Sequence, residues 1–360
     1  MAEKVLMKGN EALAEAAIMA GCRHYFGYPI TPQTEVAAYM SKKMPKIGGT
    51  FLQAESEIAA INMVLGVAST GKRVMTSSSS PGISLKSEGL SYLAGCDLPA
   101  LVVNVQRGGS GLGGIQPSQS DYFHATRGAG HGDFHMIVLA PSNVQEMVNL
   151  TFKGFDLADK YRMTSMILAD GTMGQTMEPV LLEQGEITQY EKPWATTGTK
   201  MERPHNIVNS LFLKPEQLEV ENFKRYERYK KIEETEALYD TYRMEDADVC
   251  VVAFGIGARV SHNAIDEARK AGIKAGMIRP ITLWPFPKAA LKEAAGKVKA
   301  FISVELSMGQ MIEDIELATR CAKPVMLCNR VGGMIPTVKN VYDSIVEADK
   351  IGGDNNGCCI

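Results

Sequence analysis

The sequence predicts an α/β fold made of two doubly wound domains, each built on a parallel sheet. Short segments rich in valine, leucine and isoleucine, such as residues 100–105 and 247–253, alternate with helical segments along most of the chain. Strands that are apolar on both faces are typical of parallel sheets covered by helices. The alternation stops near residue 183 and resumes near residue 246, and a chain of 360 residues is long enough for two hydrophobic cores.

The spacing of apolar residues predicts the elements of the first domain, residues 1–183. Ala12, Leu13 and Ala16 recur at helical spacing, and Gly21 follows as a C-terminal glycine. The same criteria predict helices at 10–19, 34–40, 56–68 and 84–94, another that begins at the capping residue Ser142, and strands at 25–28, 73–76, 100–105, 136–140, 164–170 and 180–182.

Composition changes between residues 184 and 245. Three prolines, Pro193, Pro204 and Pro215, precede a charged helix that carries aromatic residues. We expect a linker that covers one domain or a partner chain. The second domain, residues 246–360, begins with a strand at 247–254 and a glycine turn, and continues with a helix at 260–271 and strands at 273–279, 301–305 and 325–328.

Charge and cysteine content narrow the class of protein. The net charge is −3, without a basic face, so nucleic acid is not an expected partner. The seven cysteines are scattered and odd in number, which indicates reduced thiols and the cytoplasm. The chain begins without a secretory signal pattern and has no apolar run of the roughly 20 residues that cross a bilayer, so we expect no membrane association.

Three loops that follow predicted strands are candidates for a binding site, because parallel sheets bind ligands beyond the carboxyl ends of their strands. The first is Tyr28-Pro29-Ile30-Thr31-Pro32, in which two prolines stiffen the backbone around one hydroxyl. The second is the hydroxyl-rich segment 76–84, and the third is the glycine-rich segment 107–120. Ordinary helix capping and a mobile surface loop explain the last two about as well.

Two charged residues stand out beside these loops. The first is a glutamate, Glu55 or Glu57, at the start of an otherwise apolar helix, where the helix dipole and nearby buried surface can tune a carboxyl group for proton transfer. Arg107 directly follows the strand at 100–105 and would present a planar fork to a carboxylate. A solvated arginine is the plainer interpretation of the same position.

Metal and dinucleotide sites are less well supported. His124, His131 and His135 do not match a common zinc spacing, and no Cys-x-x-Cys is present, so we expect neither a metal site nor an iron–sulfur cluster in this chain. Gly255-x-Gly257 lacks the third glycine of the dinucleotide fingerprint, and tight packing of a strand against a helix explains it equally well.

Three motifs together resemble a known family. Tyr28-Pro29-Ile30-Thr31-Pro32, then Ser56-Glu57 before an alanine-rich helix, then Val103-Asn104-Val105-Gln106-Arg107-Gly108-Gly109 have the order and spacing of the 2-oxoacid:ferredoxin oxidoreductases. The second half resembles the second domain of the same enzymes and the C-terminal domain of transketolase-like proteins. The resemblance therefore covers nearly the whole chain, and it implies that the first domain binds the pyrimidine half of thiamine diphosphate.

The resemblance also implies residue roles. Glu57 would hydrogen-bond the pyrimidine ring, Tyr28, Pro29 and Ile30 would contact the cofactor, and Thr31 and Arg107 would bind the 2-oxoacid. The family's Gly-Asp-Gly motif for diphosphate and magnesium is missing, since Asp170 follows an alanine and Asn355-Asn356 precede no helix. The chain would thus be an α subunit, acting with a β subunit that carries the diphosphate site, with γ and δ subunits that carry iron–sulfur clusters, and with ferredoxin and coenzyme A.

The substrate implied is a 2-oxoacid, decarboxylated oxidatively to its acyl-CoA. The run from Gly111 to Phe123 is more similar to the branched-chain (2-oxoisovalerate) α subunits than to the 2-oxoglutarate type. Lys72 or Lys86 could still bind the distal carboxylate of 2-oxoglutarate, and pyruvate is a further alternative. Two other classes remain open at this stage, a nucleotide-binding dehydrogenase built on Gly255-x-Gly257 and a non-catalytic scaffold subunit.

Overall fold

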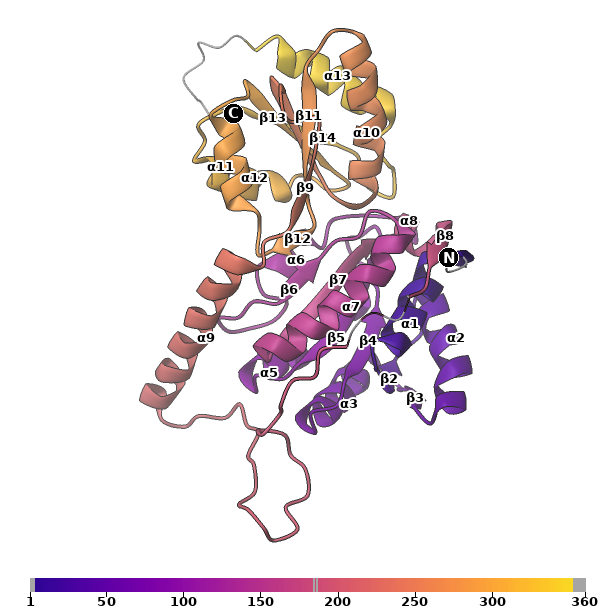
Figure 1. The fold of residues 1–360 in the computed structure, drawn as a ribbon, viewed down its shortest axis with the longest axis vertical. Helices are drawn as coiled ribbons and strands as arrows, with labels where there is room; N and C mark the ends of the chain where they lie inside the picture. Colours follow the sequence, from indigo (N-terminus) through magenta and orange to yellow (C-terminus); the bar gives the residue numbers. More distant parts are fainter. Residues whose placement is uncertain (1–3, 184, 186, 352–360) are drawn as a thin grey trace.

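The computed structural model describes residues 4–183, 185 and 187–351, and it confirms the predicted α/β class. The chain folds into two lobes. The larger lobe is formed mainly by the first half of the chain, and the smaller lobe lies above it in Figure 1. Each lobe is built on its own, mostly parallel sheet with helices on both faces. Cys358, Cys359 and the Asn355-Asn356 pair lie outside the described residues.

The larger lobe is built on a sheet that has seven strands within the described residues, in the order β12-β6-β7-β5-β4-β2-β3. Its strands are β2 (His24–Gly27), β3 (Thr50–Gln53), β4 (Val74–Ser78), β5 (Ala100–Gln106), β6 (Ile137–Leu139), β7 (Thr164–Asp170) and β12 (Thr282–Trp284). Its helices are α1 (Gly9–Met19), α2 (Thr34–Lys43), α3 (Glu57–Ser69), α4 (Ser80–Leu85), α5 (Ser87–Gly95), α6 (Tyr122–Thr126), α7 (Val144–Tyr161) and α8 (Gly171–Gln175), with a 3-10 turn at Met44–Ile47. The fully buried β4, β5 and β7 form its centre.

The smaller lobe is built on a sheet with five strands in the described part of the chain, in the order β14-β13-β10-β11-β9. Its strands are β9 (Tyr239–Tyr242), β10 (Val249–Ala253), β11 (Ala275–Pro280), β13 (Ala300–Glu305) and β14 (Val325–Asn329), and its helices are α10 (Gly255–Lys270), α11 (Lys288–Ala295), α12 (Met311–Thr319) and α13 (Val338–Asp349). Only β9 runs antiparallel among these described strands, because it enters the edge of the sheet from the linker.

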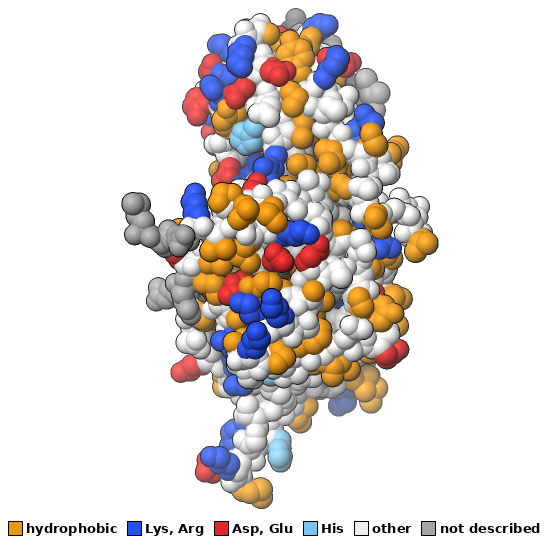
Figure 2. Space-filling view, turned by 90° about the vertical axis from the view of Figure 1, so that its right-hand side faces the viewer, with side chains coloured by type: hydrophobic (Ala, Val, Ile, Leu, Met, Phe, Trp, Pro, Cys, Tyr) orange, Lys and Arg blue, Asp and Glu red, His pale blue; other side chains and the backbone are white. Residues whose placement is uncertain are grey.

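The linker contributes one element to each lobe. Its helix α9 (Pro215–Thr235) buries Tyr229 and Ile232 in the core of the larger lobe, while its last strand, β9, pairs with β11 in the smaller sheet. In the opposite direction, β12 leaves the smaller lobe and pairs antiparallel with β6. The chain therefore crosses between the lobes several times, and part of the segment 187–214, which precedes α9, extends away from the larger lobe as a long loop (Figures 1 and 2).

Some short elements were not predicted from the sequence. β1 (Lys4–Lys8) forms a two-stranded antiparallel ribbon with β8 (Met177–Leu181), apart from the main sheet. The edge strand β3 has a largely exposed pattern, so it lacks the apolar run by which strands are recognised. The segment 77–82, expected as a polar turn, instead includes the start of α4, with Pro81 in its first turn.

The face of the molecule in Figure 2 carries basic and acidic side chains side by side, together with scattered hydrophobic ones. In the part of the chain that the structure describes, no helix has both the length and the apolar character needed to cross a bilayer.

Asp170, at the end of β7, joins the two lobes. Its carboxylate accepts a hydrogen bond from the backbone amide of Met173, in the first turn of α8, at 3.0 Å. Its other oxygen accepts from the amide of Ile256, in the first turn of α10 of the smaller lobe, at 2.8 Å. Burial raises the pKa of Asp170, although these amides act in the opposite direction. One buried carboxylate therefore caps two helices from different lobes.

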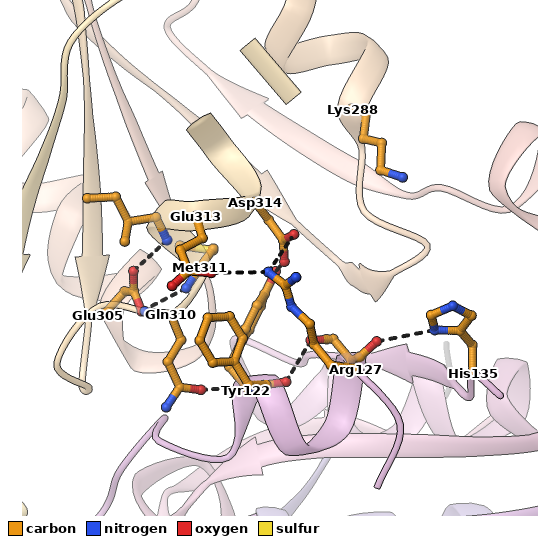
Figure 3. A network of polar contacts seen from close by, with 12 residues as sticks. Tyr122, Arg127, His135, Lys288, Glu305, Gln310, Met311, Glu313 and Asp314 are labelled. Carbon is orange, nitrogen blue, oxygen red and sulfur yellow. Dashed lines mark hydrogen bonds and ion pairs between the residues drawn. The ribbon is translucent and has the colours of Figure 1, made fainter. Parts of the chain in front are cut away.

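A second junction lies around the first turn of α12 (Figure 3). The buried carboxylate of Glu305 accepts hydrogen bonds from the amides of Gln310, Met311 and Ile312 and so caps this helix. Asp314, on the same helix, accepts from the hydroxyl of Tyr122 at 2.6 Å and from Arg127 at 3.2 Å, both of the larger lobe. The orientation of α12 is thereby fixed against α6.

We predict that Asp170→Ala destabilises the chain by about 2–4 kcal/mol, because it leaves two buried amide donors without acceptors. Chemical denaturation of the full chain measures the free energy of unfolding. Asp246→Ala is the matched control, because its carboxylate pairs with Arg269 at the surface with half of its side chain exposed. We expect a control loss below about 1 kcal/mol, and equal losses in the two variants would contradict the role given to Asp170.

Candidate functional site

The candidate site lies at the carboxyl ends of β2, β3, β4 and β5, where parallel sheets bind ligands. The predicted site residues follow these strands: the 28–32 loop follows β2, Glu57 follows β3, the serine-rich segment follows β4, and Arg107 follows β5. The fold thus brings the three loops chosen from the sequence to one edge of one sheet.

Glu57 is the first residue of α3, and only 6% of it is exposed. Ser56 caps the helix by accepting a hydrogen bond from the amide of Ala59 at 3.2 Å. No hydrogen-bond donor among the described residues reaches the Glu57 carboxylate, so this buried group can still accept from a ligand. Glu55, the alternative candidate, is exposed and accepts from the Ser56 hydroxyl at 2.7 Å.

The turn from β4 into α4, residues 77–82, connects the separate parts of the site. Ser77 bonds to Tyr25 at 2.7 Å and donates to the Gln33 side chain at 2.5 Å, so it is tied to the loop after β2. Ser80 accepts from the Arg107 amide at 3.0 Å. At the far end of the turn, Gly82 lies against the Glu57 carboxylate: a Cβ atom added to it would be 2.7 Å from Glu57 Oε1.

Arg107 is a buried cation that pairs with no carboxylate of the described residues. It is 8% exposed, and its guanidinium donates to the carbonyl oxygens of Thr31 at 3.0 Å and Leu112 at 3.3 Å. Its Nε is buried and makes no hydrogen bond. Because buried charges are normally paired, an arginine with free donors at a site edge is suited to bind an anion.

The 28–32 loop is held at both ends. Tyr28, Pro29 and Thr31 are exposed, and Ile30 is half-buried. The carbonyl oxygen of Pro32 accepts hydrogen bonds from Asn10 at 2.8 Å and Gln175 at 3.0 Å. The Thr31–Pro32 peptide bond is cis. The loop is therefore anchored through its backbone, with its side chains directed to the outside.

Unsatisfied polar atoms are concentrated at this edge of the sheet. The hydroxyls of Ser78 and Ser79, Nε2 of Gln106 and Nε of Arg107 are all buried and have no hydrogen-bond partner in the described part of the chain. Such atoms are uncommon in folded proteins and need an explanation. A polar ligand that reaches the ends of β4 and β5 would supply the missing partners, and this fits a heterocycle that carries both donors and acceptors.

The two lysines considered for 2-oxoglutarate are poorly placed to bind its distal carboxylate. Lys72 is exposed but precedes β4, so it lies at the amino edge of the sheet, opposite the site. Lys86 is fully buried, and its ammonium donates to the Thr76 hydroxyl at 3.1 Å. In this structure neither side chain is presented to a substrate.

The dehydrogenase alternative conflicts with the packing at Gly255. The amide of Ile256, which a pyrophosphate at the start of α10 would need, is already bonded to Asp170. A Cβ at Gly255 would lie 2.5 Å from the Asp170 carboxylate. This glycine therefore allows the two lobes to approach each other closely.

The three histidines have separate surroundings. His124 pairs with Ser87 at 3.3 Å, His131 packs edge-on against Tyr92, and His135 stacks on Trp284 with ring centres 4.7 Å apart. The described residues contain no group of three or more His, Cys, Asp or Glu side chains that could hold a metal ion.

Two residues beside the site were missed as functional candidates. Gly82 was grouped with an ordinary turn, and Lys86 was considered only as a ligand for substrate. A glycine in the first turn of a helix, close to a predicted acid, was the available signal for Gly82. The sequence around Lys86, which is polar, gave no sign of its burial.

We predict that Gly82→Ala destabilises the chain by about 1–3 kcal/mol and displaces the Glu57 side chain. The added Cβ would lie 2.1 Å from Ser78 Oγ and 2.7 Å from Glu57 Oε1, so both side chains would have to move. Gly66→Ala is the matched control, since this glycine lies in α3 with open space around its would-be Cβ. We expect the control to gain up to about 1 kcal/mol from helix propensity. Denaturant unfolding of both variants tests this, and an unchanged Gly82 variant would contradict the close packing.

Family models and related proteins show what this chain is similar to. Residues 15–243 match the thiamine-diphosphate-binding model of pyruvate flavodoxin/ferredoxin oxidoreductase, and residues 247–341 match core domain II of pyruvate:ferredoxin oxidoreductase. The chain is 48% identical to ketoisovalerate oxidoreductase subunit VorB of Methanothermobacter marburgensis, over 98% of this chain and 99% of that one. It is 32% identical to 2-oxoglutarate synthase subunit KorA of the same organism, over 96% and 99%.

Solved structures show the same fold. A 2-oxoglutarate:ferredoxin oxidoreductase from Magnetococcus marinus, with 2-oxoglutarate, coenzyme A and succinyl-CoA bound, matches with a TM-score of 0.88 and 29% identity, over 97% of this chain and 66% of that chain. A split-gene transketolase shares the fold with a TM-score of 0.61 and 14% identity, over 96% of this chain and 99% of that one. The chain therefore belongs to the 2-oxoacid:ferredoxin oxidoreductase family, as one subunit of a multi-subunit enzyme that carries the family's thiamine-diphosphate-binding domain.

Proposed function

We propose that Glu57 is the acid–base group that activates thiamine diphosphate in the oxidative decarboxylation of a branched-chain 2-oxoacid to its acyl-CoA. Ferredoxin takes the electrons in this reaction. The observation that carries the proposal is the Glu57 carboxylate itself, which is buried at the carboxyl edge of the sheet and free of hydrogen bonds from the described residues.

The position of Glu57 suits proton exchange with a pyrimidine nitrogen. Glu57 lies at the amino end of α3, where the helix dipole attracts a negative charge, and the residue is 6% exposed. A hydrogen bond to the ring would give this buried carboxylate the partner that it lacks, and the hydroxyls of Ser78 and Ser79 are available for other polar atoms of the ring. Bound thiamine diphosphate supplies the electron sink that loss of carbon dioxide from a 2-oxoacid requires.

Arg107 is proposed to hold the substrate carboxylate. Its uncompensated charge and unused donors favour an anion, and the carbonyl oxygen of Thr31 holds the guanidinium at the site edge. The Thr31 side chain is exposed beside it and can donate to the substrate. Tyr28, Pro29 and Ile30 are proposed to line the cofactor side of the same loop.

An apolar substrate side chain is favoured over a second carboxylate. The glycine-rich loop after Arg107 presents Leu112 and Ile115, which are 85% and 59% exposed. Lys72 and Lys86 are not directed toward this loop in a way that would bind a distal carboxylate. The ketoisovalerate name of the relatives at 47–48% identity points to the same class, whereas the KorA subunits at 32–34% identity act on 2-oxoglutarate by name.

Partner subunits are proposed to complete the site. The chain lacks a Gly-Asp-Gly motif for diphosphate and magnesium, which we assign to a β subunit, and γ and δ subunits would supply the iron–sulfur clusters that pass electrons to ferredoxin. Apolar side chains are exposed around Glu57: Leu52 by 39%, Ile58 by 50% and Leu85 by 50%. We propose that the β subunit covers these side chains and so closes the cofactor between the two chains.

We predict that Glu57→Gln, in the complex assembled with its natural partners, lowers kcat by at least about a hundredfold, because the amide cannot exchange the proton. Glu55→Gln is the matched control, an exposed neighbouring carboxylate that should keep nearly full activity. Oxoacid-dependent reduction of an artificial electron acceptor measures turnover. A scaffold subunit would give full activity in both variants, and that result would refute the catalytic role.

We predict that Arg107→Met raises KM for 2-oxoisovalerate by roughly a hundredfold or more, the cost of removing a charge-assisted pair with the substrate carboxylate. In the wild-type complex, kcat/KM for 2-oxoisovalerate should exceed that for 2-oxoglutarate. A preference for 2-oxoglutarate would contradict the proposal that the substrate has an apolar side chain. An unchanged KM in the variant would contradict the role of Arg107.

A further inference from the structure

Lys86 is a buried lysine beside the site, and the proposed reaction assigns it no role. It lies between α4 and α5 with 0% of its surface exposed. Lysines are almost never fully buried unless they are paired with an acid. The ammonium of Lys86 instead donates to the Thr76 hydroxyl at 3.1 Å and makes a long contact with the carbonyl oxygen of Glu57 at 3.5 Å.

The charge that acts on Lys86 is that of Glu57. Burial lowers the pKa of Lys86 to about 8, and attraction to the Glu57 carboxylate opposes this effect. The other ionisable groups near this turn are engaged elsewhere: Glu88 accepts a hydrogen bond from Tyr92, and His124 pairs with Ser87. Lys86 therefore lies behind the first turn of α3, where its ammonium contacts the Glu57 carbonyl oxygen and is attracted by the Glu57 carboxylate without forming an ion pair with it.

We propose that Lys86 is a positioning residue for the reaction, which holds the start of α3 in place through its contact with the Glu57 backbone and places a buried positive charge behind the Glu57 side chain. This inference rests on the proposed role of Glu57. Lys86 is fully buried, and the missing side chain of Gly82 leaves room for the Glu57 carboxylate, because a Cβ there would lie 2.7 Å from Glu57 Oε1. Lys86 therefore acts through Glu57 and touches neither cofactor nor substrate.

The charge of Lys86 gives a pH signature. When the pH rises through about 8, the lysine loses its proton and its charge. The Glu57 carboxylate then lacks its buried counter-charge, and proton exchange with the pyrimidine becomes less favourable. We expect kcat/KM of the wild-type complex to fall across this range.

Three variants in the assembled complex test the proposal, with kcat/KM for 2-oxoisovalerate measured from pH 6 to pH 10. Lys86→Met should lower kcat/KM at pH 7 by roughly tenfold, because the charge behind Glu57 is lost, and should remove the fall near pH 8. Lys86→Arg keeps the charge, so it should restore most of the activity at pH 7 and also lack the fall. Lys72→Met, an exposed lysine at the opposite edge of the sheet, should reproduce the wild-type profile.

A second readout does not depend on turnover. Infrared difference spectra of the full chain, with the Glu57 band assigned by subtracting Glu57→Gln, should show a shift of that carboxylate band between pH 7 and pH 9.5. The shift should be absent in Lys86→Arg. This measurement needs only the wild type, Glu57→Gln and Lys86→Arg, so it decides the matter even if Lys86→Met fails to assemble.

The outcomes separate the two claims. If Glu57→Gln is inactive while Lys86→Met retains the wild-type pH profile, or if the wild-type carboxylate band does not move, the role of Lys86 is refuted and that of Glu57 stands. If Glu57→Gln is fully active, the proposed function itself fails. If kcat/KM of Lys86→Met is lower than that of the wild type by the same factor at every pH from 6 to 10, the lysine is purely structural. That result would also overturn the proposal.

Discussion

The serine turn between β4 and α4 is the constraint on which the site depends. Its hydroxyls and amides reach three other elements: Ser77 is bonded to Tyr25 and Gln33, and Ser80 to the backbone of Arg107. Because β4 is central and fully buried, the turn cannot move without disturbing the core. Glu57, Arg107 and the 28–32 loop are thus held relative to one another by one short segment.

Two buried carboxylates cap helices near the junction of the lobes. Asp170 caps α8 and α10, and Glu305 caps α12, so each helix is held at its amino end by an acid that extends from a strand. Gln119, at the end of the glycine-rich loop, donates to the carbonyl oxygen of Phe254 and accepts from the amide of Leu306. The loop that follows Arg107 is therefore anchored on the smaller lobe. The second domain anchors this loop, and the Ile256 amide of the same domain reaches the carboxyl end of β7 at Asp170.

Much of the fold was predictable because it is local. Apolar runs and capping residues identified most of the central strands and the helices around them, and Glu57 was recognisable as an acid at the start of an apolar helix. The exchange of short strands was not predictable, since β12 is three residues long and pairs with β6 across 140 residues of sequence or more. Strand pairing at such a separation is decided by the packing of the two lobes, which leaves no local pattern.

The interior of the site was harder to predict than its outline. Arg107 could be identified from its place after β5, but its contact with the carbonyl oxygen of Thr31 joins residues 76 apart. Lys86 lies in the helix predicted at 84–94, among serine and glutamate residues typical of an exposed helix face, and the structure buries it completely. Asp170 was considered only as part of a diphosphate motif that is incomplete, because its role as a double cap requires both lobes in place.

The proposed function depends on a hydrogen bond between the Glu57 carboxyl group and the pyrimidine ring of thiamine diphosphate. The most direct measurement is a structure of the assembled enzyme with thiamine diphosphate bound. The account predicts that a Glu57 oxygen lies within hydrogen-bond distance, about 2.6–3.2 Å, of a pyrimidine nitrogen, with the diphosphate held by a different chain. A cofactor remote from Glu57, or one held entirely by this chain, would contradict it.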